Sequence, residues 1–180
     1  AGRRAHPVRE PAPSRRHHHR TIGEDTMKVS QVDTHSALRT WAKGAYPLEA
    51  GVELLIRTSD GRFAADTQPW IQPGDNPGWW WVDADQLTDD NLGALSGAEA
   101  RMLRIAASLL AGAPVNLYEA VPGLDRDHVQ LVLAAIAHTS GSHEHAGHPV
   151  PDPVGRYRTS DGTRMTIPRL GSLYPWPDPA

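Results

Sequence analysis

Apolar residues recur at intervals of three and four in several stretches of this chain, which is the pattern of amphipathic helices. The strongest pattern covers residues 125–139, where Asp125 supplies a helix cap. Its predicted inward face consists of Val129, Val132, Leu133, Ile136 and Ala137. A second helix is predicted over residues 96–111, with Ser96 and Glu99 as a capping box. The two helices flank a short predicted helix, the NLYEAV segment of residues 116–121.

Two more helices are predicted nearer the start of the chain. Residues 33–44 form one amphipathic segment that ends at Gly44. Residues 46–58 place Pro47 at a first helical position and space Leu48, Val52 and Leu55 as one buried stripe. The competing interpretation is a strand over residues 52–57, because the turn sequence SDG follows it. The helical spacing favours the helix.

Three consecutive tryptophans lie in a predicted strand over residues 79–82. Side chains alternate between the two faces of a strand, so Trp79 and Trp81 share one face and Trp80 lies on the other. One interpretation is an aromatic platform for a base, a sugar or a peptide. The favoured one is that Trp70 and two of the three fill the core. We then expect Trp79 and Trp81 to pack under the predicted helices 96–111 and 125–139.

The five-residue sequence RTSDG occurs twice, at residues 57–61 and 158–162. Two copies do not make a repeat architecture, and we interpret them as independent turns. Asp-Gly favours a hairpin turn, so residues 156–167 are predicted to form a hairpin with Tyr157 and either Met165 or Ile167 on its strands.

Together these elements predict a mainly helical α+β fold, with helices packed on a small antiparallel sheet and a tri-helical, helix-turn-helix-like segment at residues 96–141. Residues 1–26 contain few large apolar side chains, which predicts disorder. We interpret them as an upstream extension or a basic tail, since Met27 opens the globular pattern. The predicted divisions are a disordered basic extension at 1–26, one helical α+β domain at 27–141, a flexible His/Pro-rich connector at 142–155, and a hairpin with a C-terminal tail at 156–180.

Charge is divided unevenly along the 180 residues, whose net charge is −3. Residues 1–26 carry six Arg against three acids, and residues 27–180 carry twelve basic against eighteen acidic side chains. An acidic body argues against nucleic-acid binding. The absence of cysteine excludes disulfides and thiolate chemistry. No apolar run approaches the roughly 20 residues of a membrane span, and we expect a cytoplasmic protein with no membrane contact.

The segment HTSGSHEHAGHPVPDP, residues 138–153, gathers four histidines near one glutamate. Histidine is a common metal ligand, which makes His143, His145 and His148 weak candidates for a metal site. Their spacing follows the predicted helix end and provides no rigid frame for ligands. We therefore expect a solvated connector in which they hold nothing in place, with no metal and no cofactor.

The three helices between residues 98 and 141 resemble a helix-turn-helix or the helical part of a winged helix, with the hairpin at 156–167 as a wing. That resemblance implies DNA binding by the last helix. The start of this helix carries Arg126 as its only cation, beside Asp125, Asp127 and His128. Phosphate contacts need more positive charge than this.

No linked set of catalytic residues is recognisable, and the acidic residues between Asp83 and Asp90 lack the pattern of a calcium loop. We therefore expect no enzyme. The sequence favours a non-catalytic interaction or regulatory module, for which a protein partner or self-association is favoured over nucleic acid. The alternative is a helix-turn-helix or winged-helix-like DNA-binding protein. The candidate binding surface consists of Trp79, Trp80, Trp81, Arg126 and His128.

Overall fold

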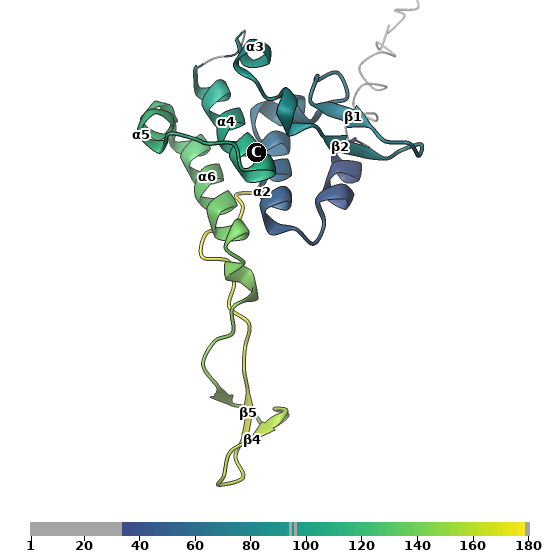
Figure 1. Cartoon of the computed structure of the whole chain (residues 1–180). Helices are drawn as coiled ribbons and strands as arrows, with labels where there is room; N and C mark the ends of the chain where they lie inside the picture. Colours follow the sequence, from purple (N-terminus) through teal and green to yellow (C-terminus); the bar gives the residue numbers. More distant parts are fainter. Residues whose placement is uncertain (1–33, 94, 96, 179–180) are drawn as a thin grey trace, which may run out of the picture.

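The computed structural model describes residues 34–93, 95 and 97–178, and shows a mainly helical α+β fold, as predicted (Figure 1). Its helices are residues 34–42, α2 (Tyr46–Arg57), α3 (Asp89–Leu92), α4 (Gly97–Ala111), α5 (Leu117–Ala120) and α6 (Arg126–Thr139), with short 3-10 turns η1 (Ser59–Ala64), η2 (Ala84–Gln86), η3 (Val121–Gly123) and η4 (Ser142–Glu144). The strands are β1 (Ile71–Pro73), β2 (Trp80–Val82), β3 (Val150–Pro151), β4 (Tyr157–Arg158) and β5 (Arg164–Thr166).

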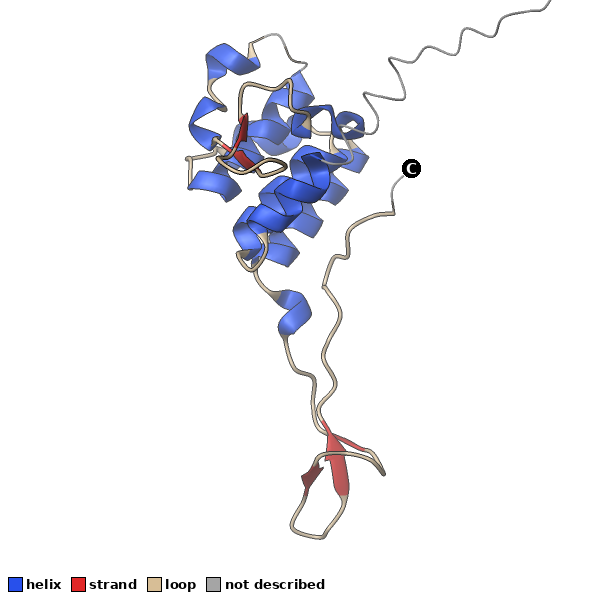
Figure 2. Cartoon of the chain, turned by 90° about the vertical axis from the view of Figure 1, so that its right-hand side faces the viewer, coloured by secondary structure: helices blue, strands red, loops and turns tan. Residues whose placement is uncertain are grey.

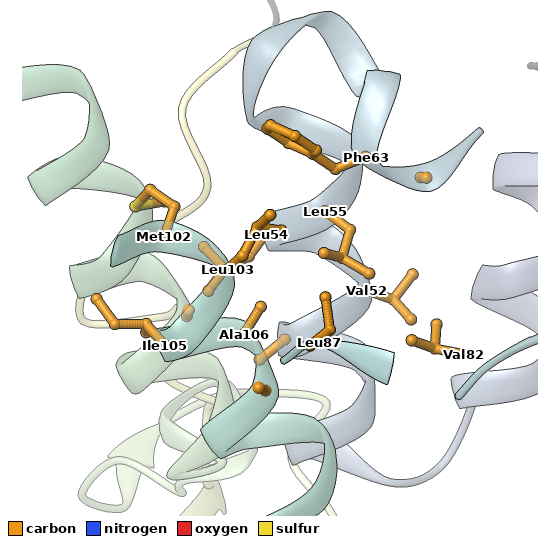
Figure 3. Close-up of a cluster of buried hydrophobic side chains, with 14 of the residues drawn as sticks. Val52, Leu54, Leu55, Phe63, Val82, Leu87, Met102, Leu103, Ile105 and Ala106 are labelled. Atoms are coloured by element: carbon orange, nitrogen blue, oxygen red, sulfur yellow. The ribbon is translucent and has the colours of Figure 1, made fainter. Parts of the chain in front are cut away.

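Helix α2 lies at the centre of the helical body, with α4 and α6 packed against it. Its prediction as a helix is confirmed, and Pro47 lies in its first turn, where a missing N–H costs no hydrogen bond. The alternative strand over residues 52–57 does not form. Apolar side chains from α2, η1, β2, α4 and the residue after η2 meet in the core of Figure 3: Val52, Leu54, Leu55, Phe63, Val82, Leu87, Met102, Leu103, Ile105 and Ala106.

Helix α6 begins at its predicted cap, because the side chain of Asp125 accepts a hydrogen bond from the N–H of His128. Its inward face, however, differs from the prediction. The buried residues are Leu131, Val132, Ala134, Ala135 and Ala137, whereas Leu133 and Ile136 are 38% and 52% exposed. Alanines allow two helices to approach closely, so the helix turns its small side chains inward and leaves two large apolar ones outside.

Strands β1 and β2 form a two-stranded antiparallel hairpin in which Ile71 pairs with Val82, and Pro73 with Trp80. Ile71 and Val82 are buried, and Trp80 on the same face packs against the core. Trp70 also lies in the core, as predicted, and its indole N–H donates to the carbonyl of Phe63.

The predicted core position of Trp79 and Trp81 is wrong. These residues lie on the opposite face of the hairpin, and Trp79 is 47% exposed. A two-stranded hairpin lying on helices has only one covered face, and Trp80 occupies it.

The predicted hairpin at residues 156–167 is confirmed. Tyr157 pairs with Met165, and β3 pairs with the other side of β5, so the strand order is β3-β5-β4. Both Figure 1 and Figure 2 show this small sheet at the end of an arm that projects from the C-terminal end of α6. We call residues 145–172 the arm. Beyond it the chain returns to the helical body, where Trp176 packs against the core.

Two predictions fall on residues outside the described part of the chain: the disorder of residues 1–26 and the role of Ser96 in a capping box. The partner of Ser96, Glu99, accepts hydrogen bonds from the side chains of Ser59 and Arg62. The flexibility of residues 142–155 and the division of the chain at residue 141 stay predictions.

Candidate functional site

The outer face of the β1–β2 hairpin carries an aromatic surface beside a shallow depression of about 500 Å³. It is lined by Pro73, Gly74, Asp75, Asn76, Trp79 and Trp81. The alternation of β2 places both tryptophans on this face, and the turn that joins the strands supplies the polar side chains. We call this surface the tryptophan face.

Local backbone structure holds Trp79 in place on the tryptophan face. The N–H of Gly74 donates to the carbonyl of Trp79 at 2.8 Å, and the N–H of Trp79 donates to the carbonyl of Asn76 at 3.0 Å. A Cβ on Gly74 would lie 2.3 Å from Cδ1 of Trp79, so the ring lies where only glycine leaves room. The glycine therefore leaves the space that the indole occupies.

Histidines 138 and 143 meet at the junction of α6 and η4. Their rings stack with centroids 4.7 Å apart, and the ring of Tyr46 meets that of His143 edge-on at 4.9 Å. His138 Nε2 lies 2.6 Å from a carboxylate oxygen of Glu49 on α2. The expectation that all three histidines of the connector hold nothing in place is therefore wrong for His143. Its position results from the left-handed residue Gly141, which turns the chain back over Tyr46. His145 and His148 lie exposed in the arm.

The pKa of the Glu49 carboxyl reflects this arrangement. Burial alone raises the pKa of this carboxyl. The hydrogen bond from the Gly44 N–H, the hydrogen bond with His138 and the charge attraction to His138 lower the pKa by more than burial raises it. The net pKa of Glu49 is thus below its ordinary value, and the carboxylate stays charged beside the two histidines.

The C-terminal residues 173–178 pass beside this cluster and return to α2. The guanidinium of Arg57 lies 5.2 Å from the ring centroid of Trp176 and donates to the carbonyl of Pro177 at 2.7 Å. A cavity of about 260 Å³ next to Trp176 is lined by Arg39, Glu49, Val52, Glu53, Arg57 and His138. The charged groups in it pair with one another, since Glu53 binds both Arg39 and Arg57. The C-terminal segment thus packs against the helical body beside this cavity.

A larger depression of about 620 Å³ lies between α3, α4 and α5 and contains two arginines. Arg104 pairs with Asp89 at 2.7 Å, and Arg101 lies over Gly123 and donates to the carbonyl of Glu119. Both guanidinium groups therefore interact within the fold.

Arg126 and His128, the remaining residues of the predicted binding surface, lie at the start of α6. The ring Nδ1 of His128 lies 2.8 Å from the carboxylate of Asp125, and Arg126 is exposed. The structure does not bring them together with the three tryptophans into one surface: Trp79 and Trp81 form the tryptophan face, Trp80 packs inward, and Arg126 lies on another helix.

Within residues 34–93, 95 and 97–178, no three His, Asp or Glu side chains gather in the way that a metal ion requires. No helix in this part of the chain has the length and apolar character for crossing a membrane.

Sequence reasoning missed several residues that shape these surfaces. His138 contacts Glu49, Tyr46 and Trp176, which lie far from it in the sequence. No spacing pattern in the sequence predicts these contacts. The exposure of Leu133 and Ile136 did have a signal, because Ala134 and Ala135 occupy the opposite side of α6.

Comparisons with known proteins assign no relative: no family model, no curated protein and no solved structure matches this chain.

Proposed function

We propose that this chain is a non-catalytic interaction module that associates with a second copy of itself through the outer side of α6 and the arm. The observation that carries the proposal is the exposed apolar stripe on α6. Leu133 and Ile136 lie outside while the alanines of the same helix are buried. Large exposed apolar patches on a folded domain mark contact surfaces.

The arm and α5 add two further apolar surfaces. Val154 on the arm is 82% exposed, and Tyr157 and Leu170 are also largely exposed. On α5 and η3, Leu117, Tyr118 and Val121 are exposed as well. A sheet with strands of two or three residues is marginal by itself, so a partner surface would stabilise the arm.

The arrangement of these surfaces fits a two-fold partner. The arm leaves from the C-terminal end of α6, and α5 lies just before its N-terminal end (Figure 1). If two α6 helices pair antiparallel through Leu133 and Ile136, the arm of each copy passes α5 of the other. Each apolar surface then meets an apolar surface, as a closed isologous dimer requires.

The test is the mass of the full chain in solution over a range of concentrations, measured by light scattering and sedimentation. We expect a dimer whose dissociation constant rises at least about tenfold with Ile136→Asp, because a charge in an apolar contact costs more than 1.4 kcal/mol. The matched control is Thr40→Asp, which adds the same charge at an exposed position of another helix, residues 34–42.

A chain that stays monomeric at every concentration contradicts the proposal. The alternative function makes a different prediction: retention on duplex DNA that weakens with salt and with Arg126→Ala. Such retention by the full chain, together with a mass that Ile136→Asp does not change, would favour DNA binding instead.

A further inference from the structure

The tryptophan face has the composition of a site for a cationic ligand. Trp79 is 47% exposed, and no described residue accepts a hydrogen bond from its indole N–H or from that of Trp81. The carboxylate of Asp75, which lines the same depression, has no partner among the described side chains. Indole rings attract cations through their negative faces, and a carboxylate beside them adds charge attraction.

The surrounding sequence makes this preference stronger. Residues 63–100 contain seven Asp or Glu and no Lys, Arg or His. Both tryptophans, Asp75 and the next acids, Asp83 and Asp85, lie in this stretch. Asp89 and Glu99 pair with arginines elsewhere in the fold. The other carboxylates of the stretch repel phosphate groups, which disfavours a nucleic acid, and they attract a cation more strongly than a neutral sugar.

The backbone of the hairpin also sets the positions of both tryptophans. Gly74 leaves the room in which the ring of Trp79 lies, and strand alternation orients Trp81 to the same side. A ligand therefore meets aromatic surfaces that lose little conformational entropy on binding.

The same chain contains a segment with the complementary chemistry. Residues 1–20 carry six Arg against one Glu, and prolines at positions 7, 11 and 13. An Arg, Trp and Pro contact already occurs in the fold, where Arg57 lies over Trp176 and donates to the carbonyl of Pro177. Proline-containing segments are also typical ligands of aromatic grooves.

We propose that the tryptophan face binds the basic, proline-containing segment of residues 1–20 of the same molecule. Arginine side chains stack on Trp79 and Trp81, and one of them pairs with Asp75. The connecting residues 21–33 span up to about 45 Å when extended, which is on the scale of a small domain. Linkage within one molecule gives the segment a millimolar effective concentration, so a modest contact is sufficient.

The absence of cysteine allows a direct test in the full chain. Ser14→Cys provides a single thiol for a fluorophore that tryptophan quenches on contact. We expect quenching at low salt that is lost when Trp79 and Trp81 are both replaced by alanine. Gly74→Ala should have the same effect, because its methyl group displaces the ring of Trp79. Replacing Arg3, Arg4 and Arg9 by glutamine should also relieve quenching, and this variant leaves the folded body unchanged.

Two controls separate this contact from others. Trp176→Ala should leave the quenching unchanged, because Trp176 lies at α2 rather than on the hairpin. A fluorophore at Ser160→Cys, on the arm, should not respond to the replacement of Trp79 and Trp81. Thermal unfolding of each variant establishes that it is folded.

Each outcome decides the proposal. Quenching that persists on dilution and weakens with salt supports binding within one molecule. Quenching that disappears on dilution assigns the segment to a second copy and overturns the intramolecular contact. Fluorescence that does not depend on Trp79 and Trp81, or that a neutral oligosaccharide restores while an arginine-rich peptide does not, overturns the basic ligand altogether.

Discussion

Among single residues, the tryptophans show how neighbours of one type take different roles. Trp70 is 1% exposed, and its indole N–H donates to the carbonyl of Phe63 at 2.7 Å. We expect Trp70→Ala to lower the free energy of unfolding by about 3–5 kcal/mol, the range for large core truncations. Trp79→Ala should change it by less than about 1 kcal/mol, as at other surface positions. Urea unfolding of both variants measures the difference, and equal losses would contradict the burial seen here.

A second residue-scale prediction concerns Glu53, which accepts hydrogen bonds from Arg39 and Arg57. Burial alone raises the pKa of its carboxyl, but the two guanidinium groups outweigh it and hold the pKa below its ordinary value. A depressed folded-state pKa means that the stabilisation is complete above the unfolded pKa of about 4.3, and is lost as the pH falls through the folded value.

Glu53→Gln should therefore cost about 1–3 kcal/mol at pH 7, because it leaves guanidinium groups without their carboxylate. The same variant should show a weaker loss of stability than the wild type as the pH falls below about 4.3. Unfolding midpoints measured from pH 7 to pH 3 test this. The control is Glu144→Gln, since the pair of Glu144 with Arg169 is well exposed and contributes little.

At the scale of elements, the crossing of α2 and α4 depends on Gly51. A Cβ there would lie 2.5 Å from Cγ of Leu110, so the side chain of Leu110 occupies the space over the glycine. In an exposed helix, Gly→Ala stabilises by about 1 kcal/mol. In this helix we expect Gly51→Ala to destabilise by about 1–3 kcal/mol, because the added methyl overpacks the contact.

A double-mutant cycle with Leu110→Ala separates the two effects. Removing the Leu110 side chain should make Gly51→Ala neutral or stabilising, which appears as a coupling energy between the sites. Additive effects of the two changes would show that α4 does not depend on Gly51 for its approach to α2.

At the scale of the whole molecule, the arm extends far from the helical body (Figure 2). Its arginines at positions 156, 158 and 164 are exposed, whereas Arg39, Arg57 and Arg104 lie in helices and pair with carboxylates. Within the described residues, we therefore expect trypsin to cut first at the arm. Mass spectrometry of the fragments identifies the sites.

The proposed dimer adds a concentration dependence to this cleavage. Contact with a second copy should slow the cutting at Arg156 and Arg158 as the protein concentration rises. The Ile136→Asp variant should lose that protection. If the wild type and the Ile136→Asp variant are protected equally, the arm takes no part in self-association.

The sequence alone determined the local elements, because helical spacing, caps and turn residues act within a few positions. Asp125 caps α6, Pro47 lies in the first turn of α2, and the predicted hairpin at residues 156–167 forms. The alternation of Trp79, Trp80 and Trp81 about β2 follows from the same local geometry.

Only the tertiary structure decided which face of each element is buried, because that depends on what else packs there. α6 turns its alanines inward, and the hairpin covers Trp80 and leaves Trp79 outside. The two copies of RTSDG also show that tertiary context decides the local structure. After Arg57 the backbone is left-handed at Ser59, Asp60 and Gly61, the first residues of η1, whereas after Arg158 the same sequence closes the hairpin of the arm. Identical residues fold differently because the first copy follows a packed helix and the second joins two paired strands.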